Sequence, residues 1–563
     1  MRTKTLLLTL LGISAYAQAL RLDPSSISNA ASQIPPGYPN SGVSHGGMFI
    51  VKAAPGSGPL GACGIKLADK FPIATSMNGT SMKIAAGNSS YDVPMIYVVA
   101  CQSVPDQLAG IVPSAVPPGA ATLTVSYGGQ SASAPILIAD RTPGVFTVNQ
   151  GGTGPAIVQN ANSNTDVPVN LLTAPARPGQ YAILWGTGLG PDGNSDVDAP
   201  KPTDLPLDVE VLVGGKRAAI TYRGRSGCCA GVDQIVFVVP DGLDGCFVPL
   251  SVRIGNAVSN FTTMSVSAAA DTCSDPAFLT ASDVQAGQRN NRIRIGLAGL
   301  IRSDFERVTA PNAGVVTRTD TASAAFVDLS YLQLLGLPVR EISSPGACTV
   351  WRGGSDVLLD RPTLLSPFVN RDAGTIRITG ASGAASLSYR SGYRAGLGTA
   401  SYREPAGGPS PSTSLLEPGT VTLSSAGGGP VPGGNAIGAW NTAVAVPSPP
   451  RFENRFSAGD VQRAQGMTVT WSGADANSLV TIRGVSNPND PTAPPVAFFC
   501  VEKASAAQFT IPPAVLLSLP ASSSTGSIGL SVGATSVTRF NASNLDAAFA
   551  RATALFGRNV NFR

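Results

Sequence analysis

The chain contains the stretch Tyr181-Ala182-Ile183-Leu184-Trp185, and Gly188-Leu189-Gly190-Pro191 follows it closely. A short apolar run that ends at turn-forming glycine and proline residues is typical of a buried β-strand. The same form occurs earlier in the chain, where Phe49-Ile50-Val51 precedes Gly58-Pro59-Leu60-Gly61. The two copies lie roughly 130 residues apart, about the length of a whole β-sandwich, so the spacing predicts tandem domains.

Other segments and the overall composition support this prediction. Val209–Gly215 echoes Ser81–Gly87, and the strand-like run Val248–Ile254 echoes Leu123–Val125. The 563 residues include 63 glycines and 46 prolines, whereas charged residues make up only 13%. Many turn residues, few charges and scattered Val, Ile and Thr runs favour short strands over helices. We therefore predict an all-β chain of tandem immunoglobulin-like β-sandwich modules.

The chain is too long for one sandwich, and we expect it to be divided into five parts. A signal peptide covers residues 1–19, two sandwich modules cover 20–140 and 141–272, an irregular β-rich domain covers 273–447, and a C-terminal sandwich module covers 448–563. The last boundary rests on Pro447-Ser448-Pro449-Pro450, which is typical of a stiff linker. Near the C-terminus, only Asn544–Leu555 has a helix-like composition.

The N-terminus predicts export. A positive start with Arg2 and Lys4 precedes the apolar run Leu6–Ile13, and Ala15-Tyr16-Ala17 and Ala17-Gln18-Ala19 are overlapping cleavage motifs. The apolar run is well short of the ~20 residues that a spanning helix needs, and no later segment is long and apolar enough to span a bilayer. We expect a secreted or cell-surface protein without a transmembrane segment in the mature chain.

The charge distribution bears on the class of partner. The formal net charge is only +4, and Lys and Arg are spread along the chain without a block of like charges. Nucleic-acid binding and anionic-membrane binding need a concentrated basic patch. The pattern therefore argues against a nucleic-acid partner.

The cysteines of an exported chain predict disulfides. They are Cys63, Cys101, Cys228, Cys229, Cys246, Cys273, Cys348 and Cys500. We expect the first two to pair within the first module and the last two to pair within the C-terminal part. The middle four can form two bridges in three ways, which the sequence leaves open. A zinc site is the weaker alternative, because C-x-x-C pairs are missing and the single histidine is distant.

Four segments, in order and at characteristic spacing, carry a resemblance to known proteins. They are Ala139–Thr147, Pro155–Asn160, Tyr181–Pro191 and Gly231–Pro240. Through them, residues 40–270 resemble the paired immunoglobulin-like (IPT/TIG-type) module of uncharacterised exported proteins that is expanded in Acidobacteria. The C-terminal part is similar, less specifically, to segments that accompany such proteins. The resemblance implies a bacterial, exported, immunoglobulin-like chain, and it brings no activity or catalytic residue with it.

Catalytic motifs are scarce in the sequence. A Ser-His-Asp triad would have to use His45, the only histidine, and no G-x-S-x-G elbow accompanies it. The run Gly186-Thr187-Gly188-Leu189-Gly190 lacks the spacing and the following Lys-Ser/Thr of a phosphate loop, so we interpret it as a turn after a strand. We expect His45 to be an ordinary loop residue.

One loop has the pattern of a metal ligand set. Asp192, Asn194, Asp196 and Asp198 place oxygen ligands at alternate positions, as in the first half of a calcium loop. The loop lacks glycine at its sixth position, and Thr203 stands where a bidentate glutamate would be. A polar connection between strands is the leading interpretation, and weak calcium binding is the alternative. No other cofactor is indicated.

Two functional interpretations follow. The first is a non-catalytic extracellular protein that binds, adheres or acts as a structural spacer, with a glycan, a matrix polymer or a protein as its partner. The second is a secreted, glycan-active hydrolase with accessory immunoglobulin-like modules, whose paired carboxylates would come from residues 275–447. We expect the first, without an enzymatic activity. A pocket with two acids, or His45 beside a serine, would favour the second.

Overall fold

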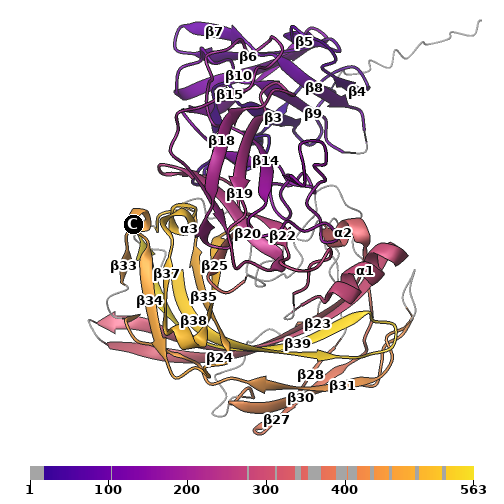
Figure 1. Ribbon diagram of the computed structural model, residues 1–563, viewed down its shortest axis with the longest axis vertical. Helices are drawn as coiled ribbons and strands as arrows, with labels where there is room; N and C mark the ends of the chain where they lie inside the picture. The colour runs from indigo at the N-terminus through magenta and orange to yellow at the C-terminus, as the bar shows by residue number, and fades with distance from the viewer. Residues whose placement is uncertain are drawn as a thin grey trace, which may run out of the picture.

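The fold is all-β: of the residues that the structure describes, ~52% are in strands and 6% in helices. The structure is a computed structural model, and it describes residues 18–102, 104–275, 278–310, 313–335, 344–352, 369–388, 402–403, 415–430, 436–455, 459–488, 493–522 and 528–563. Two immunoglobulin-like modules are stacked above a larger C-terminal body (Figure 1). The predicted signal peptide falls almost entirely on residues 1–17, outside the described residues.

The first module, residues 22–139, is a sandwich of two sheets. One sheet has the order β1 (Leu22–Asn29), β3 (Met48–Ala53), β9 (Gln107–Ile111), β8 (Met95–Ala100) and β4 (Gly64–Leu67). The other has the order β2 (Val43–Ser44), β11 (Gln130–Ala139), β10 (Gly119–Tyr127), β6 (Thr80–Ala86) and β5 (Ser76–Met77), with β7 (Ser89–Asp92) beside β6. Alternating side chains of both sheets meet in one apolar core around Phe49, Met82 and Leu123.

The second module, residues 144–266, is built in the same way. One sheet has the order β12 (Gly144–Val145), β14 (Tyr181–Thr187), β19 (Asp233–Val238), β18 (Ala219–Arg225) and β15 (Thr203–Asp204), with β13 (Val158–Asn160) beside β14. The other has the order β17 (Lys216–Arg217), β16 (Val209–Val213), β20 (Gly245–Ile254) and β21 (Ala257–Val258), with β22 (Thr262–Val266) beside β20. Its core gathers around Leu184, Phe237 and Leu250.

The predicted internal repeat is confirmed by the order of the strands. In the first sheet of each module, β3-β9-β8-β4 corresponds to β14-β19-β18-β15. In the second sheet, β10 and β6 correspond to β20 and β16, which are the segments that echo each other in the sequence. Loops at equivalent ends of the two modules can therefore be compared position by position.

The C-terminal body is built around one ten-stranded sheet. Its main order is β25 (Ala347–Arg352), β36 (Val496–Lys503), β35 (Leu479–Ser486), β38 (Ile528–Phe540), β39 (Ala547–Phe562), β23 (Arg292–Ala310), β24 (Ala313–Ser330) and β26 (Val369–Asn370), with β29 (Tyr402–Arg403) beside β24 and β33 (Asp460–Val461) beside β39. A four-stranded sheet has the order β28 (Gly383–Leu387), β27 (Ile376–Gly380), β30 (Gly419–Ser425) and β31 (Trp440–Val446). A three-stranded sheet has the order β32 (Arg451–Phe452), β34 (Met467–Ser472) and β37 (Gln508–Ile511).

Two details of this body differ from the sequence prediction. The expected boundary at residues 447/448 does not separate two modules, because Ile295–Glu306 of β23 pairs in parallel with Ala547–Arg558 of β39. The helix-like segment Asn544–Leu555 is mostly strand, since β39 begins at Ala547 and lies between β38 and β23. Pairing on both sides outweighs the helix propensity of its alanines.

Helices are few and short. They are α1 (Ala281–Asn290), α2 (Tyr331–Leu335) and α3 (Pro513–Leu517), with the 3₁₀ turns η2 (Arg463–Gln465) and η3 (Ala504–Ala506). No helix among the described residues is long and apolar enough to cross a membrane. Thr280 caps the N-terminus of α1, and its hydroxyl oxygen accepts a hydrogen bond from the backbone N–H of Asp283.

The three bodies pack directly against one another. Ile34 and Tyr38, which precede the first sandwich's β2, belong to the apolar core of the C-terminal body, and the Tyr38 hydroxyl donates to the Pro494 carbonyl at 2.8 Å. Phe247 of the second module packs against Phe278. The modules are therefore in direct contact with the C-terminal body and are not joined to it through linkers alone.

The disulfides follow the expected pattern. Cys63–Cys101 and Cys348–Cys500 are present, with Cα–Cα distances of 5.0 and 4.0 Å, so both predicted pairs are confirmed. The open question of the middle four cysteines is answered by Cys246–Cys273 and Cys228–Cys229. Among the described residues no cysteine is free.

Candidate functional site: the two equivalent module ends

The junction between the first two modules is organised by Arg225, at the end of β18. Its side chain is only 5% exposed. It donates to the Asp233 carboxylate at 2.8 Å, to the Gly190 carbonyl at 3.1 Å, and across the junction to the Gly46 carbonyl at 3.0 Å. A buried guanidinium needs a partner for its charge, and Asp233 supplies it. Arg225 therefore joins two loops of the second module to one loop of the first.

Asp233 is buried with its partner at the start of β19. Burial raises the pKa of its carboxyl to about 6, although Arg225 and the backbone N–H of Leu189 oppose this rise. The Leu189 N–H donates to the carboxylate at 2.8 Å. This bond fixes Gly188–Gly190 as the turn after β14, whereas Gly186 and Thr187, which the sequence also suggested as turn residues, are the last two residues of the strand.

Further hydrogen bonds close the junction. Asn29 of β1 donates its side-chain amide to the carbonyls of Thr142 and Thr187, at 2.8 and 3.1 Å. Thr187 in turn accepts the Met48 N–H at 2.9 Å and donates to the Gly231 carbonyl at 2.6 Å. Buried polar groups that are fully paired hold their surroundings in one arrangement. The first two modules thus form one rigid unit.

His45 lies beside a serine at this junction, but the geometry is not that of a triad. Its Nδ1 is 3.2 Å from the backbone carbonyl of Ser114, not from the hydroxyl. The Ser114 hydroxyl donates directly to the Asp196 carboxylate at 2.7 Å. In a catalytic triad the imidazole stands between the hydroxyl and the acid. Here the Asp196 carboxylate accepts from the hydroxyl directly, in the position that the imidazole occupies in a triad. The contacts between Ser114 and Asp196 instead hold the two modules together.

The loop from Asp192 to Asp198 takes part in the same junction, and the weak calcium binding given as the alternative stays a prediction. Asp192 accepts hydrogen bonds from Asn194 and lies 3.6 Å from Arg225. Asp196 accepts both the N–H and the hydroxyl of Ser114, and the Val197 carbonyl accepts the Ile73 N–H at 2.7 Å.

A small cavity lies beside this loop. Asp192, Asn194, Asp196 and Asp198 border a cavity of about 20 Å³, and the Arg225 guanidinium borders it as well. Within the described part of the chain, no group of three or more His, Cys, Asp or Glu residues could hold a metal ion. Of these carboxylates, Asp192 faces the positive charge of Arg225 at 3.6 Å.

The equivalent end of the first module has the same framework but is open. Asp106 precedes β9 as Asp233 begins β19, and it accepts the Leu60 N–H at 2.9 Å as Asp233 accepts that of Leu189. The second oxygen of Asp106 accepts the Cys101 N–H at 2.7 Å. One carboxylate thus pins the β3–β4 loop to the β8–β9 loop, and Cys63–Cys101 ties the same two loops covalently.

These loops enclose a groove of about 530 Å³. We call it the end groove, and it is lined by Asp23, Lys52, Ala53, Ala54, Pro55, Gly56, Ser57, Gly58, Pro59, Cys101, Val104, Pro105 and Asp106. Its volume lies in the usual range of ligand sites, about 300–1,000 Å³. Arg21 braces the outer wall by donating to the carbonyls of Pro55 and Gly56, at 2.8 and 2.7 Å.

The lining of the end groove is mostly alanine, proline and glycine, and its charged residues are Lys52, Asp23 and Asp106. Val104 is 46% exposed at its rim. The Nζ of Lys52 has no hydrogen bond or ion pair with the described residues. None of the described residues that line the groove is aromatic. Such a surface suits a loop of backbone with small side chains better than it suits a sugar ring, which usually stacks on an aromatic face.

The carboxylates of the C-terminal body are engaged with arginines. Asp304 and Glu306 lie on one face of β23. Asp304 accepts from Arg318 at 2.6 Å, while Glu306 lies 3.7 and 3.8 Å from Arg455 and Arg558. Two acids are therefore adjacent in the region where the hydrolase interpretation placed them, and each one faces positive charge.

Sequence reasoning missed the residues that matter most at these ends. Asp106 and Arg225 carry no motif, and Asp233 was noted only as part of the segment Gly231–Pro240, without a role. A signal was nevertheless present, since Asp106 and Asp233 occupy equivalent positions in two copies that otherwise differ at most charged residues. Aligning the copies residue by residue would have shown it.

No protein-family model and no curated protein matches the chain. Among solved structures it is similar to a tandem from titin, with 8% identity, a TM-score of 0.13, and coverage of 68% of this chain and 90% of that one. It is also similar to SGBP-B of the Bacteroides ovatus mixed-linkage glucan utilization locus, in complex with a mixed-linkage heptasaccharide, with 11% identity, a TM-score of 0.20, and coverage of 56% and 71%. It is similar as well to invasin, a bacterial integrin-binding protein, with 10% identity, a TM-score of 0.13, and coverage of 91% of this chain and 78% of that one.

Proposed function

We propose that this chain is an exported, non-catalytic binding protein that receives a backbone loop of an extracellular protein in the end groove of its first module. The observation that carries the proposal is the equivalence of the two module ends. In the second module, the loops after β14 and before β19 are filled by the Gly46 loop of the first module. In the first module, the loops after β3 and before β9 have the same carboxylate framework and stay open.

The occupied end indicates what the open end can bind. Arg225 donates to the carbonyl of an incoming glycine, and the Lys52 ammonium group, which has no partner among the described residues, could donate in the end groove. The Asp106 bonds and the Cys63–Cys101 bridge hold the walls in place before any partner arrives, which reduces the entropy lost on binding. A glycan is the second candidate, and the missing aromatic platform weighs against it.

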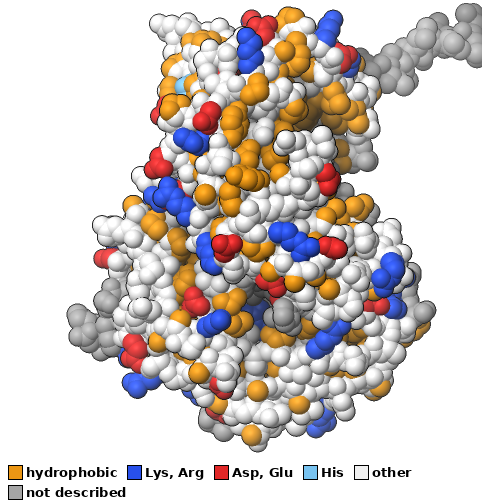
Figure 2. All heavy atoms as spheres, viewed as in Figure 1, with side chains coloured by type: hydrophobic (Ala, Val, Ile, Leu, Met, Phe, Trp, Pro, Cys, Tyr) orange, Lys and Arg blue, Asp and Glu red, His pale blue; other side chains and the backbone are white. Residues whose placement is uncertain are grey.

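Export and a bacterial surface location belong to the same proposal. Disulfides persist in oxidising compartments, and the chain carries four of them. The sequence resemblance to IPT/TIG-type modules supports the same location. The face shown in Figure 2 has acidic and basic side chains intermingled, as expected of a surface that binds neither nucleic acid nor anionic lipid.

The test is an array of purified extracellular proteins beside a glycan array, both probed with the mature chain. Val104→Arg fills the rim of the end groove, and Lys52→Glu reverses its free charge. Val537→Arg is the matched control, because Val537 is 40% exposed on β38 in the C-terminal body. We expect protein partners whose binding falls at least tenfold with both groove variants and is unchanged in the control. Binding that all three variants retain, or hits on glycans alone, would overturn the proposal.

A further inference from the structure

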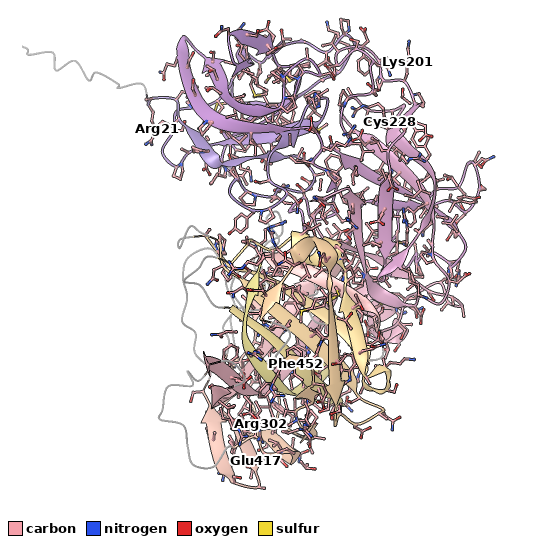
Figure 3. The ribbon with its side chains drawn as sticks, turned by 90° about the vertical axis from the view of Figure 1, so that its left-hand side faces the viewer. Arg21, Lys201, Cys228, Arg302, Glu417 and Phe452 are labelled. Atoms are coloured by element: carbon pink, nitrogen blue, oxygen red, sulfur yellow. A yellow bond between two sulfur atoms is a disulfide. The ribbon has the colours of Figure 1, made fainter. Side chains whose placement is uncertain are left out.

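The Cys228–Cys229 disulfide joins neighbouring residues at the tip of the β18–β19 hairpin. Both cysteines are exposed, and Gly227 and Gly231 flank them. Figure 3 shows Cys228 at the surface near Lys201, and a side chain at Gly227 would touch Pro202 beside it. The bridge is therefore open to reagents while the protein stays folded.

This bridge does not contribute to the fold as the others do. A disulfide restricts the unfolded chain by closing a loop, and the effect grows with loop length. The other bridges span sequence separations of 38, 27 and 152, whereas this one spans a separation of 1. Closing so short a loop restricts the unfolded chain very little, so this bridge adds little to the free energy of unfolding. Its role is local.

The internal repeat shows how the bridge arises. Cys101 stands five residues before Asp106, and Cys228 stands five residues before Asp233. In the first module the equivalent cysteine pairs across the loops with Cys63. In the second module Asp192, paired with Arg225, ties the loops instead, and Cys228 bonds its neighbour. The second module thus has an ion pair where the first module has a long-range disulfide.

We infer that Cys228–Cys229 is a thiol-exchange site for small dithiols and for thiophilic ligands. A thiolate of the dithiol attacks one of the two sulfurs, the S–S bond breaks, and the other cysteine leaves as a thiolate that takes up a proton. The second thiolate of the reagent then releases the first cysteine, and the reagent becomes a cyclic disulfide. The two adjacent thiols can next bind phenylarsine oxide, forming two As–S bonds and releasing one water.

The three other bridges serve as internal controls. Cys246, Cys273, Cys348 and Cys500 are buried. Cys63 and Cys101 are exposed like the inferred site, and they differ from it by closing a long loop. If Cys228–Cys229 is reduced before Cys63–Cys101, the difference follows from its short loop and not from exposure alone.

The experiment treats the folded mature chain with increasing dithiothreitol, alkylates the freed thiols and maps them by peptide mass. We expect Cys228 and Cys229 to be labelled at a concentration at least tenfold below that needed for Cys63 and Cys101, with an unchanged melting temperature. The reduced chain should then bind one equivalent of phenylarsine oxide, and the Cys228→Ser/Cys229→Ser double variant should bind none. Reduction of Cys63–Cys101 at the same or lower concentration, or arsenical binding that persists in the double variant, would overturn the inference.

Discussion

At the scale of single residues, two carboxylates that each accept a leucine N–H make the two module ends comparable. Asp106 and Asp233 each fix a turn through a leucine N–H, at 2.9 and 2.8 Å. They differ in their second partner, which is the Cys101 N–H in one module and the Arg225 guanidinium in the other. That difference explains why one end accepts a neighbouring module through a buried arginine and the other remains a groove tied by a disulfide.

Replacing Arg225 by leucine should weaken the junction strongly. The change leaves the Asp233 carboxylate buried without its positive partner, which costs about 3–5 kcal/mol. Burial raises the pKa of Asp233 to about 6, so below that pH the folded state protonates this carboxyl more readily than the unfolded chain does. Stability linked to that raised pKa is present at low pH and is lost as the pH rises through about 6.

The destabilisation by Arg225→Leu should therefore be larger at pH 8 than at pH 5. Calorimetric melting of the mature chain at both pH values measures it. Arg217→Leu is the control, since Arg217 is 59% exposed and its ion pairs contribute little. An equal loss of melting temperature in the two variants, or a loss that grows on acidification, would contradict the role assigned to Arg225.

At the scale of elements, the sequence predicted well where local pattern and tertiary position agree. β3 and β14 are central strands, and their apolar runs end in the turns that glycine and proline indicate. β39 was missed because its alanines favour a helix and only its neighbours make it a strand. Those neighbours are remote in sequence, since Arg294 of β23 pairs with Asp546, the residue before β39, and the two are 252 residues apart. No local window can contain that information.

The same limit applies to the candidate site. The sequence singled out His45 and the loop from Asp192 to Asp198, and the structure brings both to one junction as clamps. It did not single out Lys52, Val104 or Asp106, because a groove is made by two loops whose approach depends on sheet order. Cysteine pairing was predictable where only one partner lay in the same part of the chain.

A further element-scale prediction concerns α1, which is tied to β38 by one acid. Asp283 accepts from Arg539 at 2.6 and 2.7 Å and from the Thr280 N–H at 2.9 Å. Burial alone would raise the pKa of Asp283, but the bonds from Arg539 and Thr280 outweigh it and lower the pKa below 3.8. A lowered pKa means stability that is present above the unfolded value and lost as the pH falls through the folded value.

Asp283→Asn should lower the melting temperature at pH 7. The capping box contributes about 1 kcal/mol, and the ion pair adds up to about 1 kcal/mol because Arg539 is partly exposed. For a body of this size, the two together correspond to roughly 3–8 °C. The difference from the unchanged protein should shrink below pH 4. Asp460→Asn, at an exposed pair with Arg563, is the control and should change little.

At the scale of the whole molecule, packing between the bodies sets what can bind. The Gly46 end of the first module is covered by the second, and the second module is fixed to the C-terminal body through Phe247 and the Cys246–Cys273 bridge. The end groove lies at the opposite end of the first module, beside Arg21, where the described chain begins. A rigid support with one open end favours recognition of a partner at that end.

The most direct test of non-catalytic binding at the end groove follows one array-selected partner through a calorimetric titration. After the titration, the partner is recovered from the calorimeter cell and its mass is measured by mass spectrometry. We expect saturable binding at one site per chain, and we expect Val104→Arg to abolish it. The mass of the partner should be unchanged after prolonged incubation. A partner that is cleaved with turnover, by a chain whose activity disappears when Ser114, Asp304 or Glu306 is replaced, would contradict it.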